Sequence, residues 1–268
     1  MSHNQANLYN LDSHSAEIYD KSEVSTDDVQ LIRQLIGERK SLRILEPFCG
    51  TGRILIPLVC EGHTLVGIDQ AGGMLNRCAQ KSSQLPESVR QRITLLQADA
   101  VKDEWSSGFD MVLLGGNCFY ELATSGEQEG VIRSTARALK PGGHVYIDND
   151  HMEGELDPSW QRSGVVKSFP SGTCADGTRL ESTTEAIWFD VSRRLVRFRR
   201  YTRVTLPDGR VMEHEVIQQK HPVSKVEVQS WLEAHGFVVE YIFGDRLGHP
   251  YNDNSDRAIF WARRYKMG

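Results

Sequence analysis

The segment LRILEPFCGTGRI, residues 42–54, predicts more of the architecture than any other part of this 268-residue chain. It begins as an apolar run of strand length and passes through a glycine turn into a helix predicted to begin near Thr51. Glycine has no Cβ, so Gly50 and Gly52 let a ligand approach the backbone closely, and a helix start offers unpaired N–H groups. The segment therefore predicts a ligand site at this turn. The alternative is an ordinary packing turn, because isolated glycine patterns are common.

Further strand-like runs follow, and they alternate with helices predicted at about 52–61, 72–82 and 127–140. This alternation is typical of a parallel sheet with right-handed crossovers. Each run leads into polar or glycine residues at its carboxyl end. The runs are 63–68 before Asp69, 93–97 before Asp99 and Ala100, 109–114 before Gly115, and 144–147 before Asp148.

An acidic residue followed by G-x-G, together with Asp69 and Asp99 in this order over residues 42–150, resembles the class I S-adenosylmethionine-dependent methyltransferases. Where that family usually has a further glycine the chain has Phe48, which makes this wall of the pocket bulkier. A dinucleotide fingerprint would need a third glycine where the chain has Leu55, which weighs against a dehydrogenase. The resemblance implies an α/β fold with a Rossmann-like, seven-stranded, mostly parallel sheet whose last strand is antiparallel.

The same resemblance implies S-adenosyl-L-methionine as the cofactor and S-adenosyl-L-homocysteine as its product. Gly50 and Gly52 would pass the methionine part with Glu46 near its ammonium group, while Asp69 would hold the ribose and Asp99 the adenine. The expected cofactor-binding residues are Glu46, Phe48, Gly50, Gly52, Arg53, Asp69, Gln70, Met74, Asp99, Ala100, Gly115 and Asn117.

The methyl acceptor is expected beyond the carboxyl ends of the strands, where ligands lie in open α/β sheets. Methyl transfer from a sulfonium is an in-line displacement, and an amine acceptor must be neutral although a free alkylammonium has a pKa of about 10. A carboxylate, histidine or tyrosine is therefore useful as a proton acceptor or orienting group. The candidate catalytic residues are Asn117, Tyr120, Glu121, Asp150, His221 and Tyr19. For each, the alternative is a loop polar group with solvent as its partner.

The segment GNCF at 116–119, with Asp148 and the late hairpins, is loosely similar to the glycine and sarcosine N-methyltransferases. In that group the asparagine contacts the amino-acid substrate, which implies this role for Asn117. The group also has an arginine shortly after the fifth strand to pair the substrate carboxylate, and here Asp150 stands about there. Like charges repel strongly at low dielectric, so Asp150 and Glu121 favour a cationic or amino-bearing acceptor over glycine itself.

Other functions remain open from the sequence. Oxygen is the alternative acceptor atom, which would make the protein a small-molecule O-methyltransferase. A non-catalytic S-adenosylmethionine-binding sensor or partner protein is a second alternative, indicated only by Phe48. Methyltransferases of nucleic-acid amino groups place Asn-Pro-Pro-Tyr after strand four to hold a flipped base, whereas Asn117 is followed by Cys-Phe-Tyr.

Bulk properties agree with a small-molecule enzyme. The net charge of −5 and pI near 6.0 lack the basic footprint of a nucleic-acid or anionic-membrane partner. The five cysteines are scattered without CxxC spacing, which predicts neither disulfides nor a zinc site, and no metal is expected. The first residues lack the pattern of a signal peptide, so a cytoplasmic location is expected. The oligomeric state stays undetermined, monomer or homo-oligomer.

Four parts follow from the pattern along the chain. The predicted strands 183–190, 195–205 and 211–219 alternate like an antiparallel sheet, and Pro-Asp-Gly at 207–209 predicts a hairpin. The expected parts are an N-terminal helical cap at 1–40, a cofactor-binding core at 41–150, an antiparallel β insertion at 151–223, and the last helix and strand pair at 224–268. The resemblance to the methyltransferases implies that the insertion covers the substrate site.

Overall fold

A computed structural model of the protein describes residues 12–153 and 164–265. Its larger sheet has seven strands in the order β10-β11-β5-β4-β1-β2-β3. Strand β11 is antiparallel to both of its neighbours, while the pairs from β5 to β3 are parallel. The strands are β1 Arg43–Pro47, β2 Thr64–Asp69, β3 Ile93–Gln97, β4 Phe109–Leu114, β5 Leu139–Asp150, β10 Phe237–Phe243 and β11 Arg257–Arg264. The predicted Rossmann-like sheet with an antiparallel last strand is confirmed.

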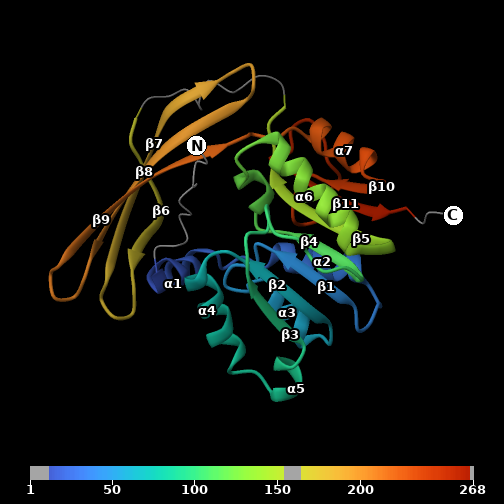
Figure 1. Ribbon diagram of the computed structural model, residues 1–268, viewed down its shortest axis with the longest axis horizontal. Coiled ribbons are helices and arrows are strands. Elements are labelled where there is room, and N and C mark those ends of the chain that lie inside the picture. The colour runs from blue at the N-terminus through green and yellow to red at the C-terminus, as the bar shows by residue number, and fades with distance from the viewer. Residues whose placement is uncertain (1–11, 154–163, 266–268) are drawn as a thin grey trace.

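Helices cover both faces of this sheet (Figure 1). Neighbouring residues of one strand enter different apolar clusters: Tyr146 packs with α2, α3 and α4, and Ile147 packs with α6 and α7. This alternation is the period-two pattern of a strand buried on both sides. The helices are α1 Asp12–Ser22, α2 Asp27–Ile36, α3 Leu55–Cys60, α4 Gly72–Ser82, α5 Glu87–Arg90, α6 Ser125–Ala138 and α7 Lys225–Ala234. None of the described helices is long and apolar enough to span a bilayer.

A second sheet of four antiparallel strands lies beside the first, in the order β6-β7-β8-β9 (Figure 1). It consists of β6 Val166–Thr173, β7 Arg179–Asp190, β8 Leu195–Thr205 and β9 Val211–Lys220. Helix α1 joins it to the core, because α1 packs against both α4 and β6. Ile18 of α1 is buried in a small apolar cluster with Cys174, Leu180 and Val204. Strand β6 was not predicted from the sequence, because it lacks clear alternation of buried and exposed residues.

Several boundaries differ from the prediction. The helix expected near Thr51 begins at Leu55, because Gly50 and Gly52 have positive φ angles of 53° and 76°, which a right-handed helix cannot include. Helix α6 ends at Ala138, since Leu139 is already extended, and β5 begins there instead of at residue 144. The glycine turn is therefore longer than expected, and it leaves more backbone open at the sheet edge.

Local capping agrees with the sequence. Ser224 and Glu227 form a capping box at the start of α7. At the start of α6, the hydroxyl of Thr124 accepts from the backbone N–H of Glu127. These caps begin the two helices that cover the face of the sheet carrying Ile147.

Candidate active site

The turn after β1 is held in the left-handed backbone region at three positions. Phe48, Gly50 and Gly52 have φ angles of 62°, 53° and 76°. A Cβ on Gly52 would lie 2.5 Å from the Sγ of Cys78, whereas one on Gly50 would meet no atom within 4 Å. Gly52 is thus required by packing against α4, and Gly50 faces open space. Phe48 adopts the conformation that the family's usual glycine would accept easily, at a local cost in strain.

Asp69 ties the end of β2 to this turn. Its two carboxylate oxygens accept from the backbone N–H groups of Gly50 at 2.8 Å and Ala71 at 2.9 Å. Burial raises the pKa of the carboxyl group. A carboxylate offers about four lone-pair sites, so both oxygens retain capacity for further donors such as hydroxyl groups.

Glu46 is the most unusual side chain at this edge. It is only 4% exposed, and its Oε2 atom is buried without a hydrogen-bond partner among the described residues. Burial raises the pKa of Glu46 to about 8. A buried carboxyl oxygen with no partner is costly, and a cationic donor from a ligand would satisfy it. The site therefore fits a ligand ammonium group next to the glycine turn.

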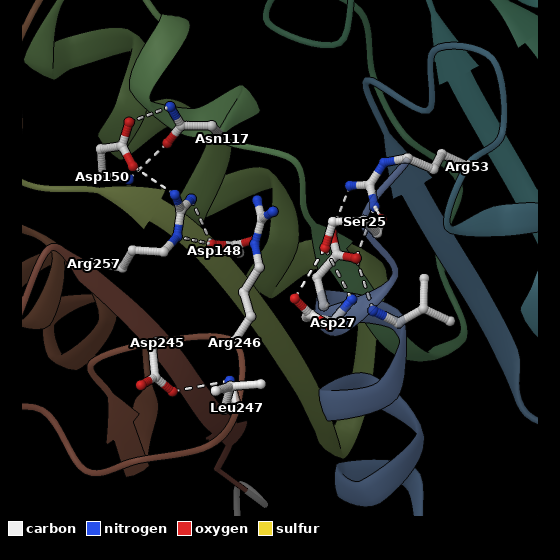
Figure 2. A network of polar contacts seen from close by, with 12 residues as sticks. Ser25, Asp27, Arg53, Asn117, Asp148, Asp150, Asp245, Arg246, Leu247 and Arg257 are labelled. Atoms are coloured by element: carbon white, nitrogen blue, oxygen red, sulfur yellow. Dashed lines mark hydrogen bonds and ion pairs between the residues drawn. The ribbon is translucent and has the colours of Figure 1, made fainter. Parts of the chain in front are cut away.

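Arg53 follows the turn and is held by the N-terminal helices. Its guanidinium group donates to both carboxylate oxygens of Asp28, at 2.8 and 2.5 Å. It also donates to the carbonyl of Ser25 at 3.0 Å (Figure 2). The Asp28 side chain is fully buried. A Cβ on Gly116 would lie 3.6 Å from Nη2 of Arg53 and 3.8 Å from the hydroxyl of Tyr19. The turns after β1 and β4 thus meet α1 at one place.

Asp99 and Ala100 follow β3. The Asp99 carboxylate accepts from Nζ of Lys102 at 2.5 Å and from the backbone N–H of Val101 at 3.0 Å. The Ala100 carbonyl accepts from the indole N–H of Trp105 at 3.0 Å. This loop is therefore ordered by its own contacts, and the carboxylate of Asp99 remains partly exposed.

The other expected cofactor residues occupy different environments. Gln70 is exposed after β2, while Met74 is buried in a cluster with Ala16 and Ala71 that brings α1 onto α4. A Cβ on Gly115 would lie 2.4 Å from Cδ1 of Ile54, so this glycine is required by close packing. Only Gln70 of these three presents a polar side chain to solvent.

A cavity of about 680 Å³ lies next to the turn after β4 and is lined on another side by the second sheet. Its lining comes from α1, the turn after β4, strands β6, β8 and β9, the loop after β10, and β11. Three expected catalytic residues line it, namely Tyr19, Asn117 and Glu121. Burial raises the pKa of Tyr19, whose ring lies edge-on to Phe169 of β6 at 6.1 Å.

Asn117 is anchored to the end of β5 in a left-handed conformation with a φ angle of 66°. Its Nδ2 donates to Asp150 at 2.8 Å, and its Oδ1 accepts from the backbone N–H of Asp150 at 2.6 Å. Arg257 of β11 pairs with Asp150 at 2.6 Å and donates to Asp148 at 2.8 Å, and Arg246 donates to Asp148 at 2.8 Å (Figure 2). Asp148 is fully buried.

This network corrects the expected role of Asp150. A negative charge facing the substrate was expected from the sequence, but the carboxylate of Asp150 is paired with the guanidinium of Arg257. An arginine therefore lies near the end of β5 after all, and β11 supplies it. Arg246 and Arg257 were both missed, because they follow no motif and lie about a hundred residues beyond their partners.

The remaining catalytic candidates separate into two groups. Glu121 lines the cavity and accepts from Lys220 at 2.5 Å and Gln218 at 2.9 Å. Tyr120 instead packs in the apolar cluster of the core. His221 is 3% exposed, its Nδ1 lies 2.8 Å from Oε1 of Gln128 in α6, and burial lowers its pKa. Neither Tyr120 nor His221 is in the cavity lining, because the chain turns into the core at both positions.

Among the residues that the structure describes, no group of three or more His, Cys, Asp or Glu side chains has an arrangement that could hold a metal ion. All five cysteines are free thiols. The polar groups at the sheet edge are thus carboxylates, amides, hydroxyls and guanidinium groups.

Comparison with known proteins identifies the core. Residues 44–143 match the family described as methyltransferase domain. A Geobacillus protein named as a methyltransferase is 23% identical over 236 residues, covering 85% of this chain and 87% of its own. A ubiquinone biosynthesis O-methyltransferase of Pseudomonas putida is 29% identical over 143 residues, covering 52% of this chain and 59% of its own length.

Solved structures share the fold. An S-adenosylmethionine-dependent methyltransferase from Clostridium acetobutylicum has a TM-score of 0.72 at 14% identity and covers 94% of this chain and 98% of its own. A sugar N-methyltransferase from Streptoalloteichus sp. has a TM-score of 0.68 at 19% identity, and the match covers 92% of this chain and 90% of its own. The chain thus contains a methyltransferase domain over residues 44–143, and its seven-stranded order and glycine turn form the fold that solved S-adenosylmethionine-dependent methyltransferases share.

Proposed function

We propose that the protein transfers a methyl group to an amine nitrogen of a small-molecule acceptor bound in the cavity of about 680 Å³. The observation that carries this proposal is that one cavity is lined by α1 and the turn after β4 on one side and by strands of the second sheet on the other. Residues 151–223 would serve as its cover and residues 41–150 as the cofactor-binding core. A space of this size suits a metabolite.

In this proposal the edge of β1, β2 and β3 holds the cofactor. The partnerless oxygen of Glu46 would accept from the ammonium group, and Gly50 would leave room beside the methionine part. Arg53 would pair with the carboxylate of the cofactor's methionine part. Asp69 would accept from the ribose hydroxyls, and Asp99 would accept from the adenine amino group. When bound, S-adenosylmethionine supplies an electrophilic methyl group attached to sulfur.

The acceptor side is built from three residues that line the cavity. Asn117, clamped to β5, would orient the acceptor, because its amide cannot rotate without breaking both contacts to Asp150. Glu121 would accept a proton from the amine or orient its lone pair. Burial raises the pKa of Tyr19, so its phenol stays protonated and would donate a hydrogen bond to a ligand. The second sheet would exclude water and hold the reacting groups in line.

Support for nitrogen comes from the carboxylate of Glu121 in the cavity and from the fold shared with a sugar N-methyltransferase. Oxygen is the second candidate, because the O-methyltransferase of ubiquinone biosynthesis matches half of this chain. The loose similarity to glycine and sarcosine N-methyltransferases stays a prediction.

A mass-spectrometric screen tests the proposal. The protein is incubated with S-adenosylmethionine and paired amines and alcohols of the same skeleton, and both S-adenosylhomocysteine and methylated product are measured. Methylated amines with a stoichiometric amount of S-adenosylhomocysteine are expected. If only alcohols are methylated, the acceptor atom is oxygen and the proposal of nitrogen is wrong. Cofactor binding without any product would indicate a sensor.

Glu46→Gln should stabilise the ligand-free protein and weaken cofactor binding. The folded-state pKa of about 8 lies above the ordinary 4.5, so the fold favours the protonated form. The corresponding stabilisation is complete below pH 4.5 and is lost as the pH rises through 8. We therefore expect the free energy of unfolding of the variant, relative to that of the wild type, to increase by up to about 1.4 kcal/mol per pH unit between these values. Denaturant unfolding at several pH values measures this difference.

Cofactor affinity should depend on pH in the opposite direction to the stability of the ligand-free protein. Binding of a ligand ammonium favours ionised Glu46, so the wild-type affinity for S-adenosylhomocysteine should rise as the pH approaches 8. Glu46→Gln should lose about tenfold or more in affinity and most of this pH dependence. Parallel stability curves for variant and wild type would contradict the assignment of the pKa.

Asp28→Asn should raise the KM for S-adenosylmethionine about three- to tenfold and leave kcat nearly unchanged. Asp28 touches no acceptor in this proposal, and it acts by holding both guanidinium nitrogens of Arg53. The matched control is Asp27→Asn, which alters an exposed neighbour that accepts from Ser25. Steady-state kinetics together with unfolding curves separate the two effects. A loss of stability in Asp28→Asn with an unaltered KM would leave Asp28 with a structural role only.

A further inference from the structure

Helix α1 contacts both the cavity and the glycine turn, through different side chains. Ile18, Tyr19 and Ser22 line the cavity. Consecutive helical residues are rotated by about 100° from one another, so Asp20 points away from Tyr19. The carboxylate of Asp20 reaches the glycine turn, where it accepts from the hydroxyl of Thr51 at 2.6 Å. Thr51 is fully buried in the middle of that turn. A single side chain of α1 is therefore hydrogen-bonded to the expected cofactor site.

The Asp20 carboxylate is held by two further donors, both from α4. It accepts from Nε of Arg77 at 2.8 Å and from Nζ of Lys81 at 2.8 Å. Lys81 also donates to the Thr51 hydroxyl at 3.1 Å. Burial raises the pKa of Asp20, but the hydrogen bonds from its three partners outweigh burial and lower the pKa overall. Charge-assisted hydrogen bonds are short and strong, so Asp20 holds α1 firmly against the turn.

Other side chains of α1 are bound to the second sheet, and the helix lies between that sheet and α4 (Figure 1). Glu17 accepts from the backbone N–H of Ala175, in the turn between β6 and β7, at 2.7 Å. Lys21 donates to the carbonyl of Thr173 at the end of β6, at 2.9 Å. Glu17 and Lys21 also pair with each other at 2.6 Å. Hydrogen bonds therefore connect the glycine turn, through α1, to the sheet that lines the cavity.

We infer that Asp20 is a positioning residue, which couples cofactor binding at the glycine turn to the placement of the second sheet at the acceptor cavity. This inference rests on the proposed function, because it takes the cavity as the acceptor site. A bound cofactor orders the glycine turn, the bond between Asp20 and Thr51 passes this order to α1, and α1 holds the turn between β6 and β7. The acceptor then binds better to the cofactor-loaded protein, and by linkage it raises the affinity for the cofactor by the same factor.

Hydrogen exchange measured by mass spectrometry tests this coupling, with S-adenosylhomocysteine as the probe. The complete protein is compared with and without a saturating concentration of this ligand. In the wild type we expect slower exchange in the glycine turn, in α1 and at residues 174–178 between β6 and β7. The slowing at residues 174–178 should be about fivefold or more.

Two substitutions of Thr51 isolate the bond to Asp20. Thr51→Val keeps the shape of the side chain but lacks the hydroxyl, so the ligand should still slow exchange in the glycine turn and no longer at residues 174–178. Thr51→Ser keeps the hydroxyl and should behave like the wild type. Asp20→Ala should show the same loss as Thr51→Val, with a lower thermal stability because two cations of α4 lose their partner. The matched control is Asp27→Asn, an exposed acidic residue that accepts from Ser25.

The inference is refuted if the ligand leaves residues 174–178 of the wild type unchanged, or if Thr51→Val retains the slowing there. If Asp20→Ala does not fold, the two Thr51 variants decide the result. No acceptor is present in this experiment, so its outcome is independent of the acceptor atom. Coupling in a protein that methylates no amine would contradict the proposed function and leave the role of Asp20 standing. Methylation of amines without coupling would do the reverse.

Discussion

Asn117→Ala should lower kcat about 10²-fold, because a displacement of about 1 Å in a positioned group costs that much. The substitution removes both hydrogen bonds that clamp the turn after β4 to Asp150. It also leaves alanine at a φ of 66°, which costs about 1 kcal/mol. The turn would then relax away from the cofactor and the cavity. Single-turnover kinetics measures the chemical step without the contribution of product release.

Two further variants separate the causes. Asn117→Gly accepts the left-handed backbone but lacks the amide, so it should avoid the backbone strain of Asn117→Ala and still lose most of the rate. Asp150→Asn keeps an amide oxygen for the clamp but breaks the pair with Arg257, so we expect a smaller loss of rate. A kcat of Asn117→Ala within twofold of the wild type would exclude Asn117 from the machinery.

Asp69→Ala should weaken binding of S-adenosylhomocysteine by about 1–3 kcal/mol, which is roughly tenfold to a hundredfold. The ribose hydroxyls would lose a charged acceptor. The structure adds a second reason, because the N–H groups of Gly50 and Ala71 would lose their partner and the glycine turn would loosen. We therefore expect the upper part of this range. Isothermal titration calorimetry measures the affinity.

Asp99→Ala is the matched comparison for this prediction. Asp99 also follows a strand at the same edge, but Lys102 already occupies one of its oxygens. Its replacement should therefore cost less than that of Asp69. An unchanged affinity in Asp69→Ala would contradict the ribose assignment, and a larger loss in Asp99→Ala would reverse the ranking of the two anchors.

Much of the fold could be predicted from local patterns. The apolar runs of β1, β2 and β4, the capping box of Ser224 and Glu227, and the turn at 207–209 all follow from residues close in sequence. The helix after the glycine turn began later than predicted, because the positive φ angles of Gly50 and Gly52 delay it. Strand β6 was missed, since a strand packed only partly against α1 shows no clear alternation.

The acceptor side was predicted less well. Tyr19, Asn117 and Glu121 were expected near one another and line one cavity, whereas Tyr120 and His221 turn into the core. Nothing in the sequence distinguished these two groups, because a polar or aromatic residue near a strand end has the same signature whether it faces a ligand or packs inside.

The apolar strand runs, the position of the glycine turn and the acidic residues at the strand ends were determined by the sequence alone, because each depends on residues within a few positions of one another. The charge of the acceptor cavity was decided only by the tertiary structure. Register pairs Arg257 of β11 with Asp150 of β5, and this neutralises a carboxylate that the sequence leaves exposed. The second sheet then brings Lys167 and Arg200 over the same space. Such pairings depend on how distant strands align, and no local pattern encodes that alignment.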